Sequence, residues 1–279
     1  MKIWQNTRLR TAVILFHVVL IAYTGVVLYP LFTMLLGSVK TTRDLIVNPY
    51  GWPEIFNWSN YARAWTEANF ALYAKNSLWV TVIATLSILL CSSMAAFILG
   101  RFKFKLNAWI FGFFVAGMIV SGRLSIIPLF LLLRDLKLLN SHTGLILVYT
   151  ANAMPFAIFL LTTFFRQVPH ELEEAAVVEG AGTWTIYWKI MLPLVRPALA
   201  TVAIFEFMGI WNDFFFPLIF LRSEKLMTIP VGLSVFFGEY ATDWATLFAA
   251  LTISVVPVIV AFIVASRQFI AGLTAGAIK

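Results

Sequence analysis

The sequence predicts an all-α, polytopic membrane protein with six transmembrane helices. Of its 279 residues, 61% are hydrophobic and 12% are charged, whereas an average soluble domain has about 25% charged residues. Six apolar runs are each long enough for a helix to cross a bilayer. These runs span residues 11–36, 76–100, 108–133, 143–165, 197–221 and 246–265. We therefore expect a single membrane domain over residues 1–279.

Basic residues precede the first run, which is too long for the core of a secretory signal peptide and has no small-residue cleavage site. We interpret it as a retained first helix. The following segment, 38–75, is polar and rich in Trp and Tyr, side chains that favour the boundary between membrane and water. We expect this segment to be the longest loop, with short helices at that boundary.

The second to fifth runs are expected to be one span each. A compact basic cluster, Arg101, Lys103 and Lys105, follows the second run, and such clusters stay in the cytoplasm. The third span is expected over 108–133 and the fifth over 197–221. Pro155 predicts a kink in the fourth span, because proline removes a helical hydrogen bond.

Six spans place both termini on one side of the membrane. The short segments on that side are the N-terminus, the 101–107 turn, the 166–196 loop and the tail, and they hold more Lys and Arg than the opposite loops. Short segments are where this bias decides orientation. We therefore expect both termini and the 166–196 loop to be cytoplasmic.

Composition and missing motifs exclude several classes of function. The net charge of +7 comes from scattered basic residues, so membrane anchoring explains it better than nucleic acid binding. Cys91 is the only cysteine, which excludes a disulfide framework and a cysteine metal cluster. The motifs His-Glu-x-x-His, Gly-x-Ser-x-Gly and Gly-x-x-x-x-Gly-Lys are absent. We therefore expect no enzyme activity, and without the phosphate loop a separate subunit must supply any ATP that the function needs.

The longest polar interruption in the C-terminal half is the 166–196 loop. Three glutamates near its start favour the positive end of a helix dipole. Gly180 and Gly182 can end this helix with positive φ, Thr183 can cap a second short helix, and Pro193 is expected to end it. The loop therefore predicts a helix–turn–helix at the membrane surface, with a small edge that another protein can approach closely.

Seven positions of this loop resemble the EAA loop of bacterial ABC importer permeases, at the spacing of that family. They are Glu174, Ala175, Ala176, Gly180, Ile190, Leu192 and Pro193. In that family the loop is the coupling helix, which docks into a groove on a cytoplasmic ATPase. The resemblance implies that these residues contact the ATPase. An amphipathic helix at the membrane surface without a partner is the alternative interpretation.

The rest of the chain resembles the carbohydrate, maltose-type branch of these permeases, and its second permease subunit in particular. The resemblance is densest over 72–265. It includes Asn76-Ser77-Leu78, Ile127-Pro128-Leu129, Leu138-Leu139-Asn140, Trp211-Asn212-Asp213 and the ending 272–279. The chain departs from the branch in the third span, where Ser121-Gly122-Arg123 replaces a proline and a neutral residue.

The resemblance implies an importer in the bacterial inner membrane, surrounded by membrane lipid. This chain would form half of the path with a second homologous permease. Two ATPase subunits would bind ATP and magnesium, so no cofactor is expected here, and an extracytoplasmic binding protein would deliver a carbohydrate solute. The end of the tail 266–279 is expected to reach between the ATPases, and the outer loop 222–244 to probe the binding protein.

Three ionisable residues, Arg123, Glu206 and Asp213, lie within predicted spans. Each would cost about 2.5–3.5 kcal/mol facing lipid, so we expect them to face the bundle interior or a wet path. At about 1.5 Å per residue, Arg123 and Asp213 lie at similar depths, roughly 22–24 Å from the inner boundary. We predict that these two interact or line one cavity. A structural ion pair remote from the solute is the alternative.

Trp211 and Asn212 precede Asp213 and complete the candidates for the solute path. Sugars are commonly held by aromatic rings against their C–H faces and by amides or carboxylates against their hydroxyls. Helix packing through the amide of Asn212 is the competing interpretation.

A secondary transporter driven by an ion gradient is the strongest alternative function. Glu206 and Asp213 would then relay protons across the membrane. Against this alternative, the spans show no obvious internal duplication of the kind that many such transporters have. The EAA loop would also serve no purpose in such a protein.

Overall fold

The computed structural model describes residues 7–67, 69–120, 122–239 and 243–277, and the regular secondary structure of these residues is helical. This confirms the predicted all-α class. The chain divides into two compact units, Met1–Phe70 with Leu233–Val255 and Ala71–Gly232 with Val256–Lys279. We describe each unit by itself, and the single membrane domain over 1–279 stays a prediction.

The first unit begins with a long helix whose described side chains are exposed over residues 13–32. Two short helices follow it, and parts of two later helices complete the unit. Its elements are α1 (Thr7–Ser38), α2 (Thr42–Val47), α3 (Ser59–Thr66), and the portions of α13 (Ile229–Glu239) and α14 (Trp244–Ala277) that fall within it. The predicted long loop therefore does contain short helices.

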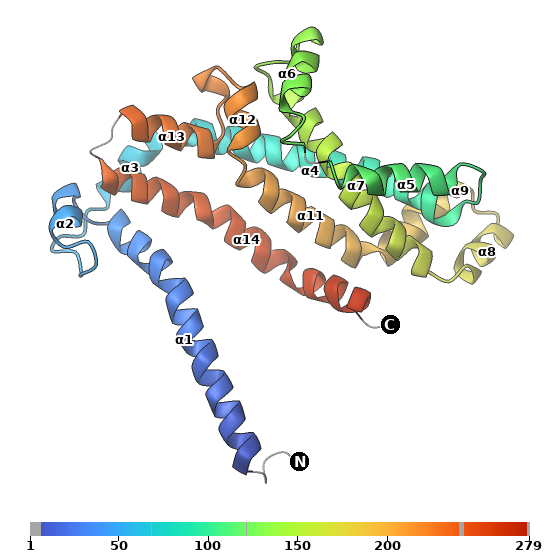
Figure 1. The fold of residues 1–279 in the computed structure, drawn as a ribbon, viewed down its shortest axis with the longest axis horizontal. Helices are drawn as coiled ribbons and strands as arrows, with labels where there is room; N and C mark the ends of the chain where they lie inside the picture. The colour runs from blue at the N-terminus through green and yellow to red at the C-terminus, as the bar shows by residue number, and fades with distance from the viewer. Residues whose placement is uncertain (1–6, 68, 121, 240–242, 278–279) are drawn as a thin grey trace. The chain divides into compact units, whose positions relative to one another are not determined.

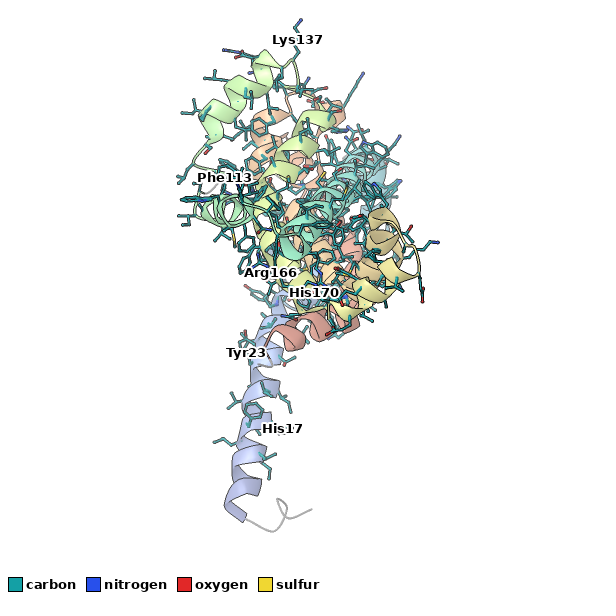
Figure 2. The ribbon with its side chains drawn as sticks, turned by 90° about the vertical axis from the view of Figure 1, so that its right-hand side faces the viewer. His17, Tyr23, Phe113, Lys137, Arg166 and His170 are labelled. Carbon is teal, nitrogen blue, oxygen red and sulfur yellow. The ribbon has the colours of Figure 1, made fainter. Side chains whose placement is uncertain are left out.

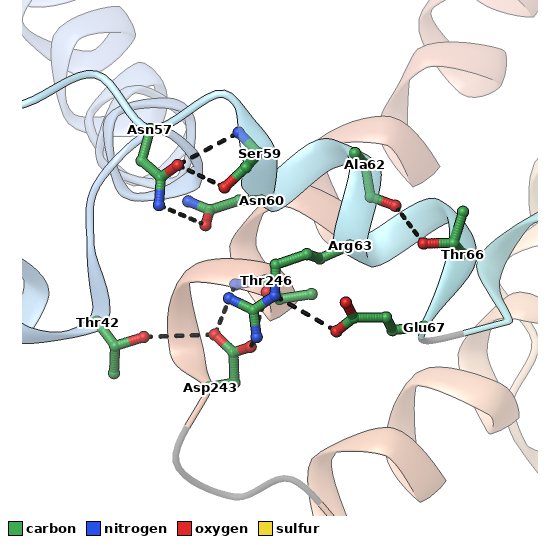
Figure 3. Close-up of polar contacts among 10 residues, drawn as sticks. All are labelled: Thr42, Asn57, Ser59, Asn60, Ala62, Arg63, Thr66, Glu67, Asp243 and Thr246. Carbon is green, nitrogen blue, oxygen red and sulfur yellow. Dashed lines mark hydrogen bonds and ion pairs between the residues drawn. The ribbon is translucent and has the colours of Figure 1, made fainter.

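A polar cluster around Asp243 joins three of these elements (Figure 3). Arg63 on α3 forms an ion pair with the Asp243 carboxylate. The hydroxyl of Thr42 on α2 donates to the same carboxylate at 3.3 Å, and that of Thr246 on α14 donates at 2.8 Å. One carboxylate thus fixes α2 and α3 to the start of α14.

The second unit holds the remaining helices around one hydrophobic core. They are α4 (Phe70–Arg101), α5 (Asn107–Gly117), α6 (Ile126–Asp135), α7 (His142–Gln167), α8 (Glu171–Val178), α9 (Thr183–Thr185), the π-helix η2 (Ile186–Met191), α10 (Leu192–Leu194), α11 (Arg196–Trp211), α12 (Phe215–Phe220) and the 3-10 helix η3 (Glu224–Leu226). Ala84, Ala157 and Ala198 are fully buried and let α4, α7 and α11 share this core. Figure 1 shows α5 lying beside α7.

Several of the described helices are suited to crossing a membrane. Four are long and apolar enough: Val13–Ser38, Phe70–Arg101, His142–Gln167 and Trp244–Ile263. The pair Thr183–Leu194 and Arg196–Trp211, bent by 74°, makes a fifth candidate if it is counted as one span. The chain is therefore a multi-pass membrane protein, and the count of six spans stays a prediction.

The third span, expected over 108–133, is not one helix. α5 ends at Gly117 and α6 begins at Ile126. In the connection between them, Gly122 lies so close to the side chain of Asn152 on α7 that a Cβ would overlap it. A larger residue here would require the Asn152 side chain to move, and the helix is interrupted where the chain contacts α7.

The fifth span, expected over 197–221, is also broken. α11 ends at Trp211 and α12 begins at Phe215. Between them, the Asp213 carboxylate accepts the backbone N–H of Phe216 at 3.1 Å. A carboxylate that satisfies a first-turn N–H stabilises the start of a helix. Asp213 therefore lies at a helix break and not in a continuous span.

Candidate functional site

The 166–196 loop forms two helical pieces joined by a glycine turn. Gly180 ends α8 with φ +84°, as predicted. Gly182 instead has φ −74° and is itself the N-cap of α9, so Thr183 is not the cap. Pro193 does not end the second piece either, because it lies in the first turn of α10, where its missing N–H is tolerated.

The seven EAA-like residues fall into two groups in this loop. Glu174, Ala175 and Gly180 are exposed, and a Cβ at Gly180 would meet no atom within 4 Å. The other four are buried or half-buried: Ala176, Ile190, Leu192 and Pro193. Ala176, Ile190 and Leu192 pack the loop onto the core of the second unit, while the exposed group lies on the surface.

An arginine at the end of α4 ties this loop to the spans. The side chain of Arg101 is only 1% exposed, and its Nε–H donates to Oε1 of Glu173 at 2.6 Å. The same guanidinium donates to the carbonyl oxygens of Phe165 at 3.0 Å and Val168 at 2.7 Å, and contacts Nδ1 of His170 at 3.1 Å. One planar guanidinium thus joins the last turn of α7 to the first turn of α8.

A second buried contact holds the other half of the loop. The hydroxyl groups of Ser93 on α4 and Tyr187 on η2 are 2.8 Å apart. Tyr187 is 2% exposed and also packs its ring against Phe97 of α4, with 5.3 Å between the ring centroids. Both helical pieces of the loop are therefore attached to α4, through residues that the sequence did not identify as functional.

A polar cavity of about 220 Å³ lies among α7, α11 and the two helix breaks. Arg123, Glu206 and Asp213 all line it. Nη2 of Arg123 is 4.0 Å from Oδ1 of Asp213, which confirms that these two residues are close enough to interact. The three ionisable residues therefore line one polar cavity, and their contact with a solute stays a prediction.

Two polar residues of α7 complete this cavity and were not predicted. The hydroxyl of Tyr149 donates to Oδ2 of Asp213 at 2.8 Å, and Asn152 lines the cavity beside Gly122. Tyr149 and Asn152 are three residues apart in an apolar run, a spacing that places both on one face of a helix. That spacing is the sequence signal that would have identified them.

Glu206 is the one predicted path residue whose carboxylate has no hydrogen bond or ion pair with any described residue. Its side chain is half-buried in the cavity lining. An ionised carboxylate is an acceptor only and takes hydroxyl or ammonium donors. The acceptor positions of Glu206 are therefore open to the cavity, and its contact with a solute stays a prediction.

The other two predicted path residues lie outside the lining of this cavity. Trp211 is buried and its ring stacks on Phe207, with 5.9 Å between centroids. Asn212 is exposed, and its side-chain amide donates to the Met208 carbonyl at 2.8 Å. Their contact with a solute stays a prediction.

Comparison with known proteins identifies a transport family. Residues 88–270 match the family described as "Binding-protein-dependent transport system inner membrane component". The chain is 37% identical to a diacetylchitobiose uptake system permease protein of Streptomyces coelicolor, over 94% of this chain and 88% of the relative. It is 34% identical to a melibiose/raffinose/stachyose import permease protein of Bacillus subtilis, over 90% of this chain and 91% of that relative.

A solved structure has the same fold over almost the whole chain. It is a bacterial ABC transporter involved in the import of the acidic polysaccharide alginate. The match has a TM-score of 0.85 and 25% sequence identity, and covers 95% of this chain and 98% of the transporter chain.

Proposed function

This chain belongs to the family of binding-protein-dependent transport system inner membrane components, in its carbohydrate ABC importer branch, and we propose that it forms half of the translocation path of such an importer. It is a transport subunit and not an enzyme. A second homologous permease supplies the other half of the path. The similarity to sugar import permeases over nine-tenths of the chain supports this proposal.

The polar cavity between the helix breaks is the proposed contact site for the solute. Buried ionisable groups in a membrane protein usually face a solute or ion path. The unpartnered carboxylate of Glu206 accepts hydroxyl groups, and the Arg123 guanidinium, whose side chain is 69% exposed, donates to ring or hydroxyl oxygens. This set of acceptors and donors suits a carbohydrate, and it is the main structural support for proposing a carbohydrate as the solute.

The 166–196 loop is the proposed contact with a separate ATPase. Its exposed edge of Glu174, Ala175 and Gly180 is small, and it leaves the α8 backbone open to a partner. Two ATPase subunits would bind ATP and magnesium, and each permease would contact one of them. Arg101 and Tyr187 would then pass the movement of the loop to α4.

We place the loop and both termini in the cytoplasm, and the solute-binding protein on the opposite side. A related structure contains an alginate pentasaccharide-bound periplasmic protein, which supports a binding-protein partner. The segment 222–244, proposed to approach that protein, contains η3 and α13. Residues 278–279 of the tail proposed to reach the ATPases lie outside the described residues.

The alternative of a proton-coupled transporter has less support from the geometry. Asp213 already accepts hydrogen bonds from Tyr149 and the Phe216 backbone, and Arg123 lies beside it. The oxygen atoms of this carboxylate are therefore already engaged by donors of the chain itself. Of the two carboxylates needed for a proton relay, Glu206 and Asp213, only Glu206 has no partner among the described residues.

Purification of the tagged chain in mild detergent tests the proposal. We expect one further permease and an ATPase to accompany it, with two ATPase subunits for each pair of permeases. A chain that purifies alone or as a homodimer, and whose uptake follows an ion gradient, would overturn the importer assignment.

A further inference from the structure

A second cavity, of about 370 Å³, lies at the α4–α5 connection beside the root of the 166–196 loop. Its lining includes the cationic side chains of Arg101, Lys103, Lys105 and Arg166, together with His170. Figure 2 shows Arg166 and His170 close together at this end of the second unit. No acidic side chain belongs to the lining formed by the described residues.

Most of this positive charge is not neutralised within the chain. Arg101 is paired with Glu173. Lys103 and Lys105 have no hydrogen bond or ion pair with any described residue. Arg166 has only the Leu99 carbonyl at 3.4 Å and the Phe111 ring, whose centroid is 4.7 Å from the guanidinium carbon. Like charges gathered without a counter-ion favour an anion in the space between them.

The start of α5 adds to the positive electrostatic potential in this cavity. Asn107, the first residue of α5, lines the cavity, and the N-cap residue Leu106 provides no side-chain cap. The N-terminal end of a helix carries partial positive charge and donates N–H groups to anions. Together with the two lysines and Arg166, it forms an anion site built from three separate segments.

The exposed apolar residues around the cavity favour a lipid headgroup over a free anion. No residue of the apolar helix α5 is buried, and Trp109 and Phe113 are 79% and 76% exposed. Phe113 is labelled in Figure 2. Phe102 and Phe104 are exposed beside the lysines. Acyl chains can lie along α5 while the phosphate occupies the basic cavity, and basic pockets at membrane boundaries bind such headgroups.

We propose that this basic cavity binds the phosphate of an anionic phospholipid. The proposal is independent of the transported solute and requires only that the spans lie in a membrane. His170 lines the cavity and also contacts Arg101, so the bound lipid would adjoin the attachment of the 166–196 loop.

The test measures lipid retained by the chain, purified with its partner subunits from nanodiscs that contain phosphatidylcholine and phosphatidylglycerol. Retained lipid is quantified by mass spectrometry. The variant Lys103→Gln/Lys105→Gln/Arg166→Gln removes three charges from the cavity. The control Lys137→Gln/Lys225→Gln/Arg222→Gln removes the same charges elsewhere in the second unit, and Arg222 also lies over a ring, that of Phe130.

We expect the wild type and the control to retain phosphatidylglycerol in preference to phosphatidylcholine. The cavity variant should lose this preference at least about tenfold, because each basic residue adds to the attraction of the protein for anionic lipid. Lys103→Arg/Lys105→Arg should keep it. If the cavity variant does not fold, Lys103→Gln/Lys105→Gln alone is used, because these side chains have no hydrogen bond or ion pair with any described residue.

Three results would overturn the proposal. The first is an equal loss in the control, which would show a general surface effect. The second is displacement of the lipid by inorganic phosphate, which would show a site for soluble anions. The third is protection of Lys103 and Lys105 from acylation by the partner subunits and not by lipid, which would assign the cavity to an acidic protein surface.

Discussion

Nε of Arg101 and Oε1 of Glu173 lie 2.6 Å apart, and this ion pair joins the end of α4 to the first turn of α8. Arg101 is almost fully buried and fills its donors with two further carbonyls and His170. Through this residue the exposed part of the loop is attached to a membrane span. The predictions below follow from this attachment and from the polar cavity.

Replacing Arg101 with Gln should destabilise the second unit and weaken coupling. The carbonyls of Phe165 and Val168 and the Glu173 carboxylate lose their donor, at a cost of about 1–3 kcal/mol for each buried group left unpaired. We expect a lower melting temperature and less solute import for each ATP hydrolysed. Lys137→Gln, at an exposed position of the second unit outside this loop, should change neither. Equal effects of both variants would contradict the role of Arg101.

Two substitutions at Gly180 separate the effect of backbone strain from the effect of contact with a partner. A residue with a side chain at φ +84° is strained by about 1–2 kcal/mol, so Gly180→Ala should lower stability but still retain the ATPase. Gly180→Trp has the same strain plus bulk, and a Cβ at this position would meet no described atom within 4 Å. We expect only the Trp variant to purify without the ATPase. Retention of the ATPase by Gly180→Trp would exclude this edge as the docking surface.

Arg123 and Asp213 should contribute unequally to stability. The Arg123 side chain is 69% exposed and 4.0 Å from its partner, so Arg123→Gln should change the free energy of unfolding by less than about 1 kcal/mol. Asp213→Ala removes acceptors for Tyr149 and the Phe216 backbone and should cost about 1–3 kcal/mol. Thermal melting of both variants measures this difference. A larger loss in Arg123→Gln would show that the pair is structural.

Glu206→Gln should weaken solute uptake without affecting assembly. Loss of a charged acceptor removes about 1.5–3 kcal/mol, so the KM for uptake should rise at least about tenfold. Glu54→Gln, at an exposed glutamate outside the cavity lining and the 222–244 segment, is the matched control and should leave KM unchanged. An unchanged KM in Glu206→Gln would place the solute path elsewhere.

The helices and the shared cavity of the three ionisable residues were predictable because they depend on local patterns. Apolar runs identified most spans, and depth counting brought Arg123 and Asp213 together. The helix breaks were not predictable, because they depend on Gly122 contacting Asn152 and on Asp213 satisfying a backbone N–H. The Arg101–Glu173 pair was missed for the same reason: its members are 72 residues apart, and no sequence spacing marks such a contact.

Uptake of labelled carbohydrate into proteoliposomes tests the central claim most directly. The chain is reconstituted with the subunits that purify with it, ATP is supplied on the side of the 166–196 loop, and all ion gradients are collapsed. Diacetylchitobiose and melibiose, named for its relatives, are the first solutes to try. An ATP-driven importer predicts uptake that requires ATP hydrolysis. Uptake that continues without ATP and follows an imposed ion gradient would contradict the account.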